Sequence, residues 1–145
     1  MIRPVFSVSL WLTLLVVGCW SPLQARAEGA RELYILHCAG CHRPHGRGAL
    51  PEVPGLWNDL GRMVQVPGGR DYPVRVPGSA QSPISDEQLR AIVNWILQAF
   101  NADTLPAGFQ PLSLDEVKAA RAEVLADPLK FRQALWQQVE LSVSD

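Results

Sequence analysis

The sequence predicts an all-α fold, in which a helical domain with long loops is followed by a helical extension. Two capping boxes, beginning at Ser85 and Ser113, each introduce a segment with apolar residues at helical spacing. A third segment with helical spacing runs from Gly29 into Cys38. Residues 43–84 hold seven of the twelve prolines, which excludes long helices and central strands from that span.

The first 27 residues have the pattern of an export signal that is later removed. Arg3 supplies the positive start, residues 5–17 form an apolar run, and Ala25-Arg26-Ala27 is a small-x-small cleavage site. The apolar run is shorter than the about 20 residues that cross a membrane. The mature chain is therefore expected to begin near Glu28 and to be periplasmic.

A second processing site lies within the same segment. Val16-Val17-Gly18-Cys19 resembles a bacterial lipobox, in which Cys19 is acylated and anchors the protein to a membrane, facing the periplasm. The sequence leaves both outcomes open, and it predicts membrane contact only for the acylated form.

After the signal, we expect a domain over residues 28–100 and a C-terminal helical extension over residues 101–145. The two together have a length typical of one domain. Removal of Arg3 and Arg26 leaves 11 of the 13 Lys and Arg against all 14 Asp and Glu, a net charge of −3. This mild charge contains no basic field that would predict binding to nucleic acid.

The first predicted helix runs from Gly29 into Cys38. Ala30, Leu33, Tyr34 and His37 recur on one face at steps of three and four residues. Because a small residue and an aromatic residue share this stripe, we expect it to cross a later helix, with Trp95 as the partner of Tyr34.

The segment Cys38-Ala39-Gly40-Cys41-His42 is the pattern of c-type haem attachment. In such a segment each cysteine sulfur adds across one vinyl group of the porphyrin, and the histidine binds the iron. The sequence therefore predicts one covalent haem c, bound by Cys38, Cys41 and His42.

Two other chemistries fit a pair of cysteines at this spacing. A zinc site would use the nearby His37, His42 and His45, but no second ligand pair follows, since His45 is the last histidine and Cys41 the last cysteine. A thioredoxin-like dithiol is expected in a βαβ setting, which a helical exported chain does not offer.

The proline-rich span is expected to wrap around the cofactor, because a haem supplies the core that such loops need. Its candidate haem-facing or core side chains are Leu50, Val53, Leu56, Trp57, Leu60, Val64, Val66, Val74 and Val76.

Three helices are predicted after this span. The first, over residues 85–100, begins with the capping box Ser85 to Gln88 and has an apolar face. The second begins at Ser113 and is expected to end near Ala126. The last begins at Asp127-Pro128 as N-cap and first helical residue.

The extension is expected to pack back on the domain or, alternatively, to dock a partner through Trp136.

Residues 30–100 resemble a class I (cytochrome c-like) monohaem domain. The resemblance is carried by Tyr34-x-x-x-Cys38-Ala39-Gly40-Cys41-His42, by Pro54-Gly55-Leu56, and by Ile84 to Leu89 leading into a helix with Trp95. It implies a cytochrome c-like helical haem fold with His42 as an axial iron ligand. It also implies that the Pro54 carbonyl accepts a hydrogen bond from His42 Nδ1.

The second axial ligand is the main departure from this resemblance. The family usually places a methionine shortly before the last helix, where this chain reads Pro77-Gly78-Ser79-Ala80-Gln81. Met63 is the only methionine of the mature chain and is the candidate for this role. The alternatives are an open iron position and a role for Met63 as core filler.

These features predict an exported one-electron carrier and not an enzyme, since no general base, paired nucleophile or phosphate loop is visible. The expected partners are a dehydrogenase as donor and an oxidase or another cytochrome as acceptor. The alternatives are a haem subunit docked to a larger dehydrogenase, and an open-site haem protein with peroxidase-like or gas-binding activity.

Overall fold

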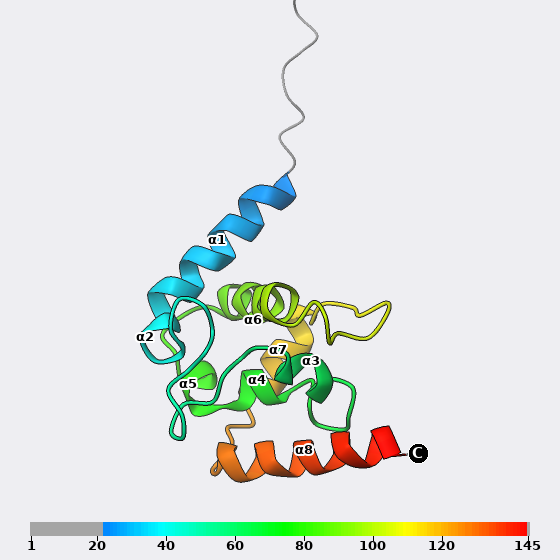
Figure 1. The fold of residues 1–145 in the computed structure, drawn as a ribbon. Helices are drawn as coiled ribbons and strands as arrows, with labels where there is room; N and C mark the ends of the chain where they lie inside the picture. The colour runs from blue at the N-terminus through cyan, green and yellow to red at the C-terminus, as the bar shows by residue number, and fades with distance from the viewer. Residues whose placement is uncertain (1–21, 145) are drawn as a thin grey trace, which may run out of the picture.

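A computed structural model describes the backbone of residues 22–144 and the side chains of residues 29–144 (Figure 1). Within this part of the chain there are eight helices and no β-strand, apart from one isolated bridge between Ala49 and Val53. The all-α prediction is therefore confirmed. Cys19 and most of the predicted export signal lie outside the described residues.

The two longest helices of the domain, α1 (Pro22–His37) and α6 (Asp86–Phe100), cross each other beside the Cys-x-x-Cys-His segment (Figure 1). Tyr34 of α1 is fully buried, and its ring lies 5.1 Å from the ring of Trp95 and 5.5 Å from that of Phe100. The predicted contact between Tyr34 and Trp95 is confirmed. Aromatic pairs at these distances contribute roughly 0.5–1.5 kcal/mol beyond the area they bury.

Side-chain hydrogen bonds determine where α6 begins and how it is held at its end. Ser85 and Gln88 form the predicted capping box, each side chain bonding the other's backbone N–H. Asn101 follows the helix and is fully buried. Its side chain accepts from the Gly61 N–H and donates to the carbonyls of Leu56 and Ile96, which ties the loop and α3 to α6.

The span after His42 contains only short helices, as its prolines predict: α3 (Asp59–Met63), α4 (Tyr72–Arg75) and α5 (Pro77–Ala80). Most of the predicted core groups in this span are buried or half-buried, and most of them share one hydrophobic cluster with the buried residues of α6. The exception is Leu50, which is 77% exposed, so its prediction as a core residue is wrong. It lies in the short turn between the bridged residues Ala49 and Val53, at the surface of the domain.

The extension begins with α7 (Leu114–Arg121), whose predicted capping box between Ser113 and Glu116 is confirmed. The helix ends at Arg121, so the expected end near Ala126 is wrong. Tertiary contacts explain the difference, because Arg75 Nε donates to the Glu123 carbonyl and the Leu125 N–H donates to the Arg75 carbonyl. These bonds draw residues 122–126 out of the helix and onto α4.

The last helix, α8 (Pro128–Ser144), begins at the predicted proline, and Asp127 Oδ1 caps it by accepting from the Lys130 N–H at 2.9 Å. It lies along the base of the domain against α3 (Figure 1). Leu135 and Val139 are buried in this contact. Over its described residues the extension thus packs back on the domain.

Candidate functional site

The cysteines and the histidine are brought together by a single helical turn. α1 ends at His37, Cys38 forms the junction, and α2 (Ala39–His42) follows at once. The Cys38 N–H bonds to the Tyr34 carbonyl at 2.8 Å, and the His42 N–H bonds to the Cys38 carbonyl at 3.0 Å. A turn of this kind places both thiols and the imidazole at the same wall of a cavity.

This cavity has a volume of about 510 Å³, within the roughly 300–1,000 Å³ found for cofactor sites. His37, Cys38, Cys41 and His42 line one side. The apolar face of α6 lines another, through Leu89, Ile92, Val93 and Ile96. The loop residues Glu52, Val53, Pro54 and Leu56, with residues of α4 and α5, complete much of the rest. The walls are largely apolar, which suits a flat aromatic cofactor.

The His42 ring is held by a loop carbonyl. His42 Nδ1 lies 3.2 Å from the Pro54 carbonyl oxygen, and a carbonyl can only accept, so the neutral ring carries its proton on Nδ1. Nε2 then keeps its lone pair and is free to bind a metal. Burial lowers the pKa of His42, and the nearby Arg132 guanidinium lowers it further, against a rise from the bond to Pro54. These effects together favour the neutral form of the ring.

The loop that carries Pro54 is fastened on both sides of the site. The Gly48 N–H donates to the His42 carbonyl at 3.0 Å, and the Leu56 N–H donates to the Gly46 carbonyl at 2.8 Å. The Tyr34 hydroxyl donates to the Arg43 carbonyl at 2.6 Å. These bonds position the Pro54 carbonyl relative to the histidine that precedes the loop.

Cys38 and Cys41 are not joined by a disulfide. Burial, and secondarily the neighbouring Cys41, raises the pKa of the Cys38 thiol to about 11. A redox-active dithiol needs a thiolate with a lowered pKa, so Cys38 lacks the activation that the dithiol alternative requires. Among the described residues, no cluster of three or more His, Cys, Asp and Glu side chains has the arrangement of a metal site.

Met63 is placed apart from these residues. It is fully buried at the end of α3, and it is not among the residues that line the cavity. Its Sδ lies 3.9 Å from Arg132 Nη1. The segment in which the resemblance implies a methionine does reach the cavity, and it contributes Pro77, Gly78 and Ser79.

The C-terminal extension forms part of the cavity wall, which the sequence interpretation missed. Ala126, Asp127, Pro128, Leu129 and Arg132 all line it. Arg132 is only 8% exposed and lies on the buried face of α8, three and seven residues before Leu135 and Val139. A cation on the apolar stripe of a helix is the signal that would have identified it.

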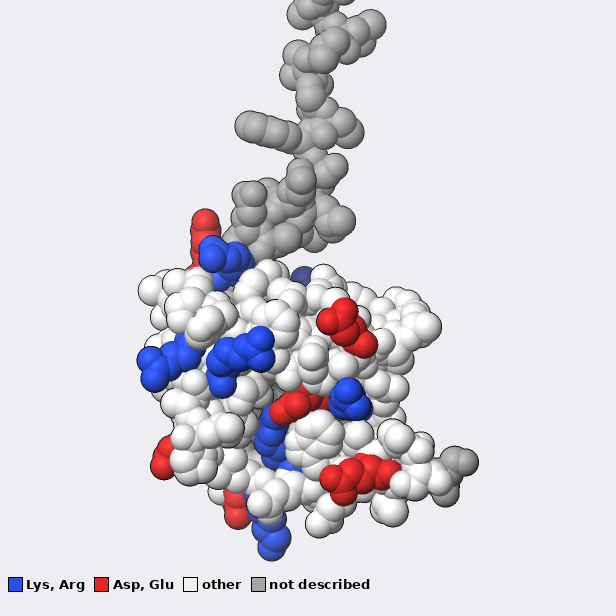
Figure 2. All heavy atoms as spheres, in the orientation of Figure 1, with Lys and Arg blue, Asp and Glu red and all other residues white. Residues whose placement is uncertain are grey.

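The outer surface carries charges of both signs. On the face shown in Figure 2, acidic and basic side chains lie scattered among uncharged atoms. No helix among the described residues is both long enough and apolar enough to cross a membrane.

Comparison with known proteins identifies relatives of this chain. No family model matches the chain. One cytochrome c-552 of Thermus thermophilus is 30% identical over 119 residues, covering 70% of this chain and 79% of the relative. A second cytochrome c-552 of Thermus thermophilus is 30% identical over 118 residues, covering 69% of this chain and 88% of the relative.

The fold and the cavity define a helical haem protein, and the similarity to cytochrome c-552 makes the family specific. The chain belongs to the class I monohaem c-type cytochromes. It is therefore an electron carrier that holds one haem c covalently. The residues of the cavity fit that group, since two thiols and a neutral imidazole meet at the wall of a largely apolar space.

Proposed function

We propose that this chain is an exported cytochrome that carries single electrons between periplasmic redox proteins, receiving them from a dehydrogenase and delivering them to an oxidase or another cytochrome. The observation that carries the proposal is the meeting of Cys38, Cys41 and His42 at the wall of one cavity. The haem supplies the chemistry, since its iron alternates between the ferric and ferrous states.

In this proposal each residue of the segment has a separate role. The Cys38 and Cys41 sulfurs would form the thioether bonds to the haem, and His42 Nε2 would bind its iron. The Pro54 carbonyl orients the imidazole through Nδ1 and increases its basicity as a ligand. The apolar face of α6 keeps water from the cofactor and so limits reorganisation during electron transfer.

Electrons would pass at the side of the cavity formed by residues 37–41, where both His37 and Cys41 are exposed. Leu36, in the last turn of α1, is 74% exposed. An exposed apolar side chain beside the cavity suits brief contact with a partner protein.

Attachment is tested by the intact mass of the full chain, produced with haem-attachment machinery. The mass should rise by one haem in wild type and in Cys19→Ser, the matched cysteine control. The Cys38→Ser, Cys41→Ser double variant should carry no covalent haem. Full loading of that double variant would contradict the proposed bonds.

The second ligand position of the haem iron would be either filled by Met63 or open. The sequence predicts Met63, and to reach the iron its sulfur would have to leave Arg132 and enter the cavity. Its burial outside the cavity favours the alternative, an open-site haem that binds a small neutral ligand such as carbon monoxide. We therefore give ligand binding at the iron as the second candidate function.

Optical spectra separate these solutions. If the iron is open, the ferrous protein should bind carbon monoxide readily, and Met63→Leu should leave the ferric spectrum unchanged. If Met63 is the ligand, wild type should show the charge-transfer band of methionine-ligated haem and resist carbon monoxide. Met63→Leu should then abolish both properties.

Docking of the extension to a larger dehydrogenase is a separate alternative. Trp136 is half-buried and lines a second hollow, of about 520 Å³, together with Trp57. Size-exclusion chromatography with light scattering tests this alternative. A free carrier elutes as a monomer, whereas a subunit copurifies with its partner and dissociates from it when Trp136 is replaced by alanine.

A further inference from the structure

We propose that Arg121 of α7 positions one wall of the haem cavity from outside, and thereby makes the iron less accessible to bulky external ligands than to small ones. This inference rests on the proposed function, because it requires a haem in the cavity lined by Cys38, Cys41 and His42. It gives the first helix of the extension a role in selecting what reaches the iron.

The wall that Arg121 holds is the segment of residues 77–84. Five of its residues line the cavity: Pro77, Gly78, Ser79, Ser82 and Ile84. It is the segment in which the resemblance implies a methionine ligand, but it contains no methionine. A bond from sulfur to iron therefore cannot hold this wall to the cofactor, so its position depends on contacts with the rest of the chain.

The segment has few means of keeping its own shape. Its helix α5 is a single turn over Pro77–Ala80. Pro77 and Pro83 have no N–H to donate. Within the part of the chain that the structure describes, every hydrogen bond that joins residues 77–84 to a distant part of the sequence comes from Arg121.

The Arg121 guanidinium bonds the backbone of the segment at three places. Nε donates to the Ala80 carbonyl at 2.9 Å, and Nη2 donates to the Ser82 carbonyl at 2.6 Å. Nη1 donates to the Ile84 carbonyl at 2.9 Å and to Asp86 Oδ1 at 2.8 Å. The rigid fork of an arginine suits several acceptors at once. Because Arg121 does not line the cavity, it holds the segment from the outer side.

The helix that carries Arg121 is itself fixed. α7 packs against α4 and α6, and its residues Val117 and Ala120 are buried. Asp86 is the first residue of α6, so the guanidinium also links the wall to the helix that lines another side of the cavity. A ligand that needs more space than the cavity offers has to displace the wall, and this displacement breaks the bonds from Arg121.

The test uses full-length ferric holoprotein of wild type and of the variants Arg121→Gln, Arg121→Lys and Arg70→Gln. Optical titration measures the dissociation constants of cyanide, a small ligand, and of imidazole, a bulkier one. Their ratio is the decisive quantity, because both ligands have to displace whatever occupies the iron, and this cost cancels. Arg70 is the matched control, because it also fastens α7, through Glu116, but makes no hydrogen bond to residues 77–84 and does not line the cavity.

We expect Arg121→Gln to lower the dissociation constant of imidazole about tenfold, because the displaced form of the wall becomes easier to populate. A tenfold change corresponds to about 1.4 kcal/mol, close to the loss of one hydrogen bond to a charged group. The dissociation constant of cyanide should change by a smaller factor. Arg121→Lys should give an intermediate ratio, since an ammonium group keeps the charge but lacks the fork that meets three carbonyls. Arg70→Gln should leave the ratio unchanged.

An unchanged ratio in Arg121→Gln would overturn the proposal. So would a wild-type ratio in Arg121→Lys, since the charge of residue 121, and not its bonds to the wall, would then set the selectivity. An equal change in Arg70→Gln would also contradict it, because any loosening of α7 would then suffice. If circular dichroism shows that Arg121→Gln does not fold, the ratio of Arg121→Lys decides in the same way. A wild-type protein without covalent haem would instead contradict the proposed function itself, independently of these variants.

Discussion

At the scale of single residues, the site depends on how closely the loop after His42 approaches its own backbone. Gly48 has a φ of +69°, a conformation that side chains with a Cβ rarely adopt. A Cβ there would collide with the Val53 carbonyl and lie 2.8 Å from the Pro54 carbonyl oxygen. The carbonyl that holds His42 therefore has its position because residue 48 is a glycine.

We predict that Gly48→Ala destabilises the protein by about 3 kcal/mol or more, since backbone strain and a collision with backbone atoms add together. Gly108→Ala is the control. Gly108 also has a positive φ, of +75°, but nothing lies within 4 Å of the added Cβ, so strain alone should cost about 1 kcal/mol. Urea unfolding measures both. Equal losses would show that the approach to Pro54 does not matter.

Asn101 is a second residue whose effect extends beyond its own helix. Its side chain serves three backbone groups, those of Gly61, Leu56 and Ile96, in a fully buried position. Asn101→Ala should cost about 2–4 kcal/mol, because these groups would be left without partners. The exposed Gln98→Ala should stay within about 0.5 kcal/mol. Thermal unfolding that shows no difference between them would contradict this account.

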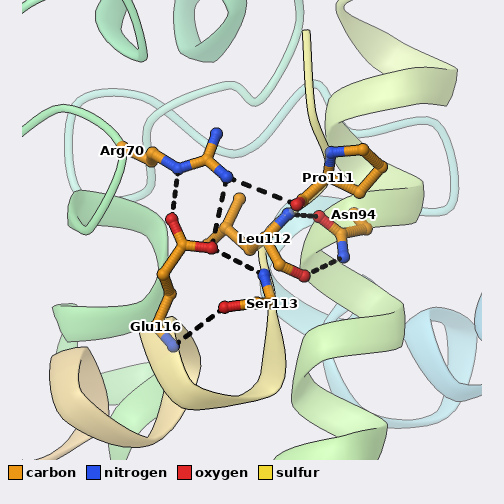
Figure 3. Close-up of polar contacts among 6 residues, drawn as sticks. All are labelled: Arg70, Asn94, Pro111, Leu112, Ser113 and Glu116. Atoms are coloured by element: carbon orange, nitrogen blue, oxygen red, sulfur yellow. Dashed lines mark hydrogen bonds and ion pairs between the residues drawn. The ribbon is translucent and has the colours of Figure 1, made fainter.

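At the scale of elements, α7 is fastened to the domain by a polar cluster (Figure 3). Arg70 Nε donates to Glu116 Oε1 at 2.6 Å, and Glu116 also accepts from the Ser113 N–H in the capping box. Asn94 of α6 bonds the backbone of Leu112 in both directions, at 2.7 and 3.0 Å. The start of α7 is thus tied both to the loop before α4 and to α6.

This cluster predicts a pH dependence of stability. The hydrogen bond from Arg70 is the main cause that lowers the pKa of Glu116 from 4.5 to about 2. Because the folded pKa is depressed, the contribution is complete above the unfolded pKa and is lost as the pH falls from about 4.5 toward 2. Both side chains are about one-third exposed, so the contribution is at most about 1 kcal/mol.

Urea unfolding between pH 5 and pH 2.5 tests this pH dependence of stability. Glu116→Gln should lose less stability with acid than wild type over that range, because the titrating group is gone. Glu123→Gln is the control, since Glu123 is 73% exposed and lies 4.0 Å from Arg75. Parallel acid curves for wild type and Glu116→Gln would refute the assignment.

At the scale of the whole molecule, export and processing are open to direct measurement. The proposed signal over residues 1–27 predicts that protein from the periplasmic fraction begins near Glu28 and carries one haem. Intact mass and N-terminal sequencing measure this. If the lipobox is used instead, the protein begins at Cys19, fractionates with membranes, and returns to the soluble fraction in Cys19→Ser.

The cavity is also a property of the whole molecule, since its walls come from the first helix, the proline-rich loops, α6 and the start of α8. The class of protein and its cofactor were predictable, because the Cys38 to His42 segment is chemically specific within five residues. The helix starts at Ser85, Ser113 and Pro128 were predictable for a similar reason. Caps are hydrogen bonds between residues three positions apart, so the sequence alone reveals them.

The features that the sequence did not reveal depend on contacts between distant residues. α7 ends at Arg121 because Arg75 bonds the backbone of Glu123, 48 positions away. Arg132 lines the cavity because it pairs with Asp59, 73 positions away. Met63 lies outside the cavity, against that same arginine.

The sequence by itself determined the Cys38 to His42 segment and the starts of the helices, because these are local patterns. Only the tertiary structure decided which cation and which part of the extension line the cavity, because those contacts exist only once the extension packs on the domain.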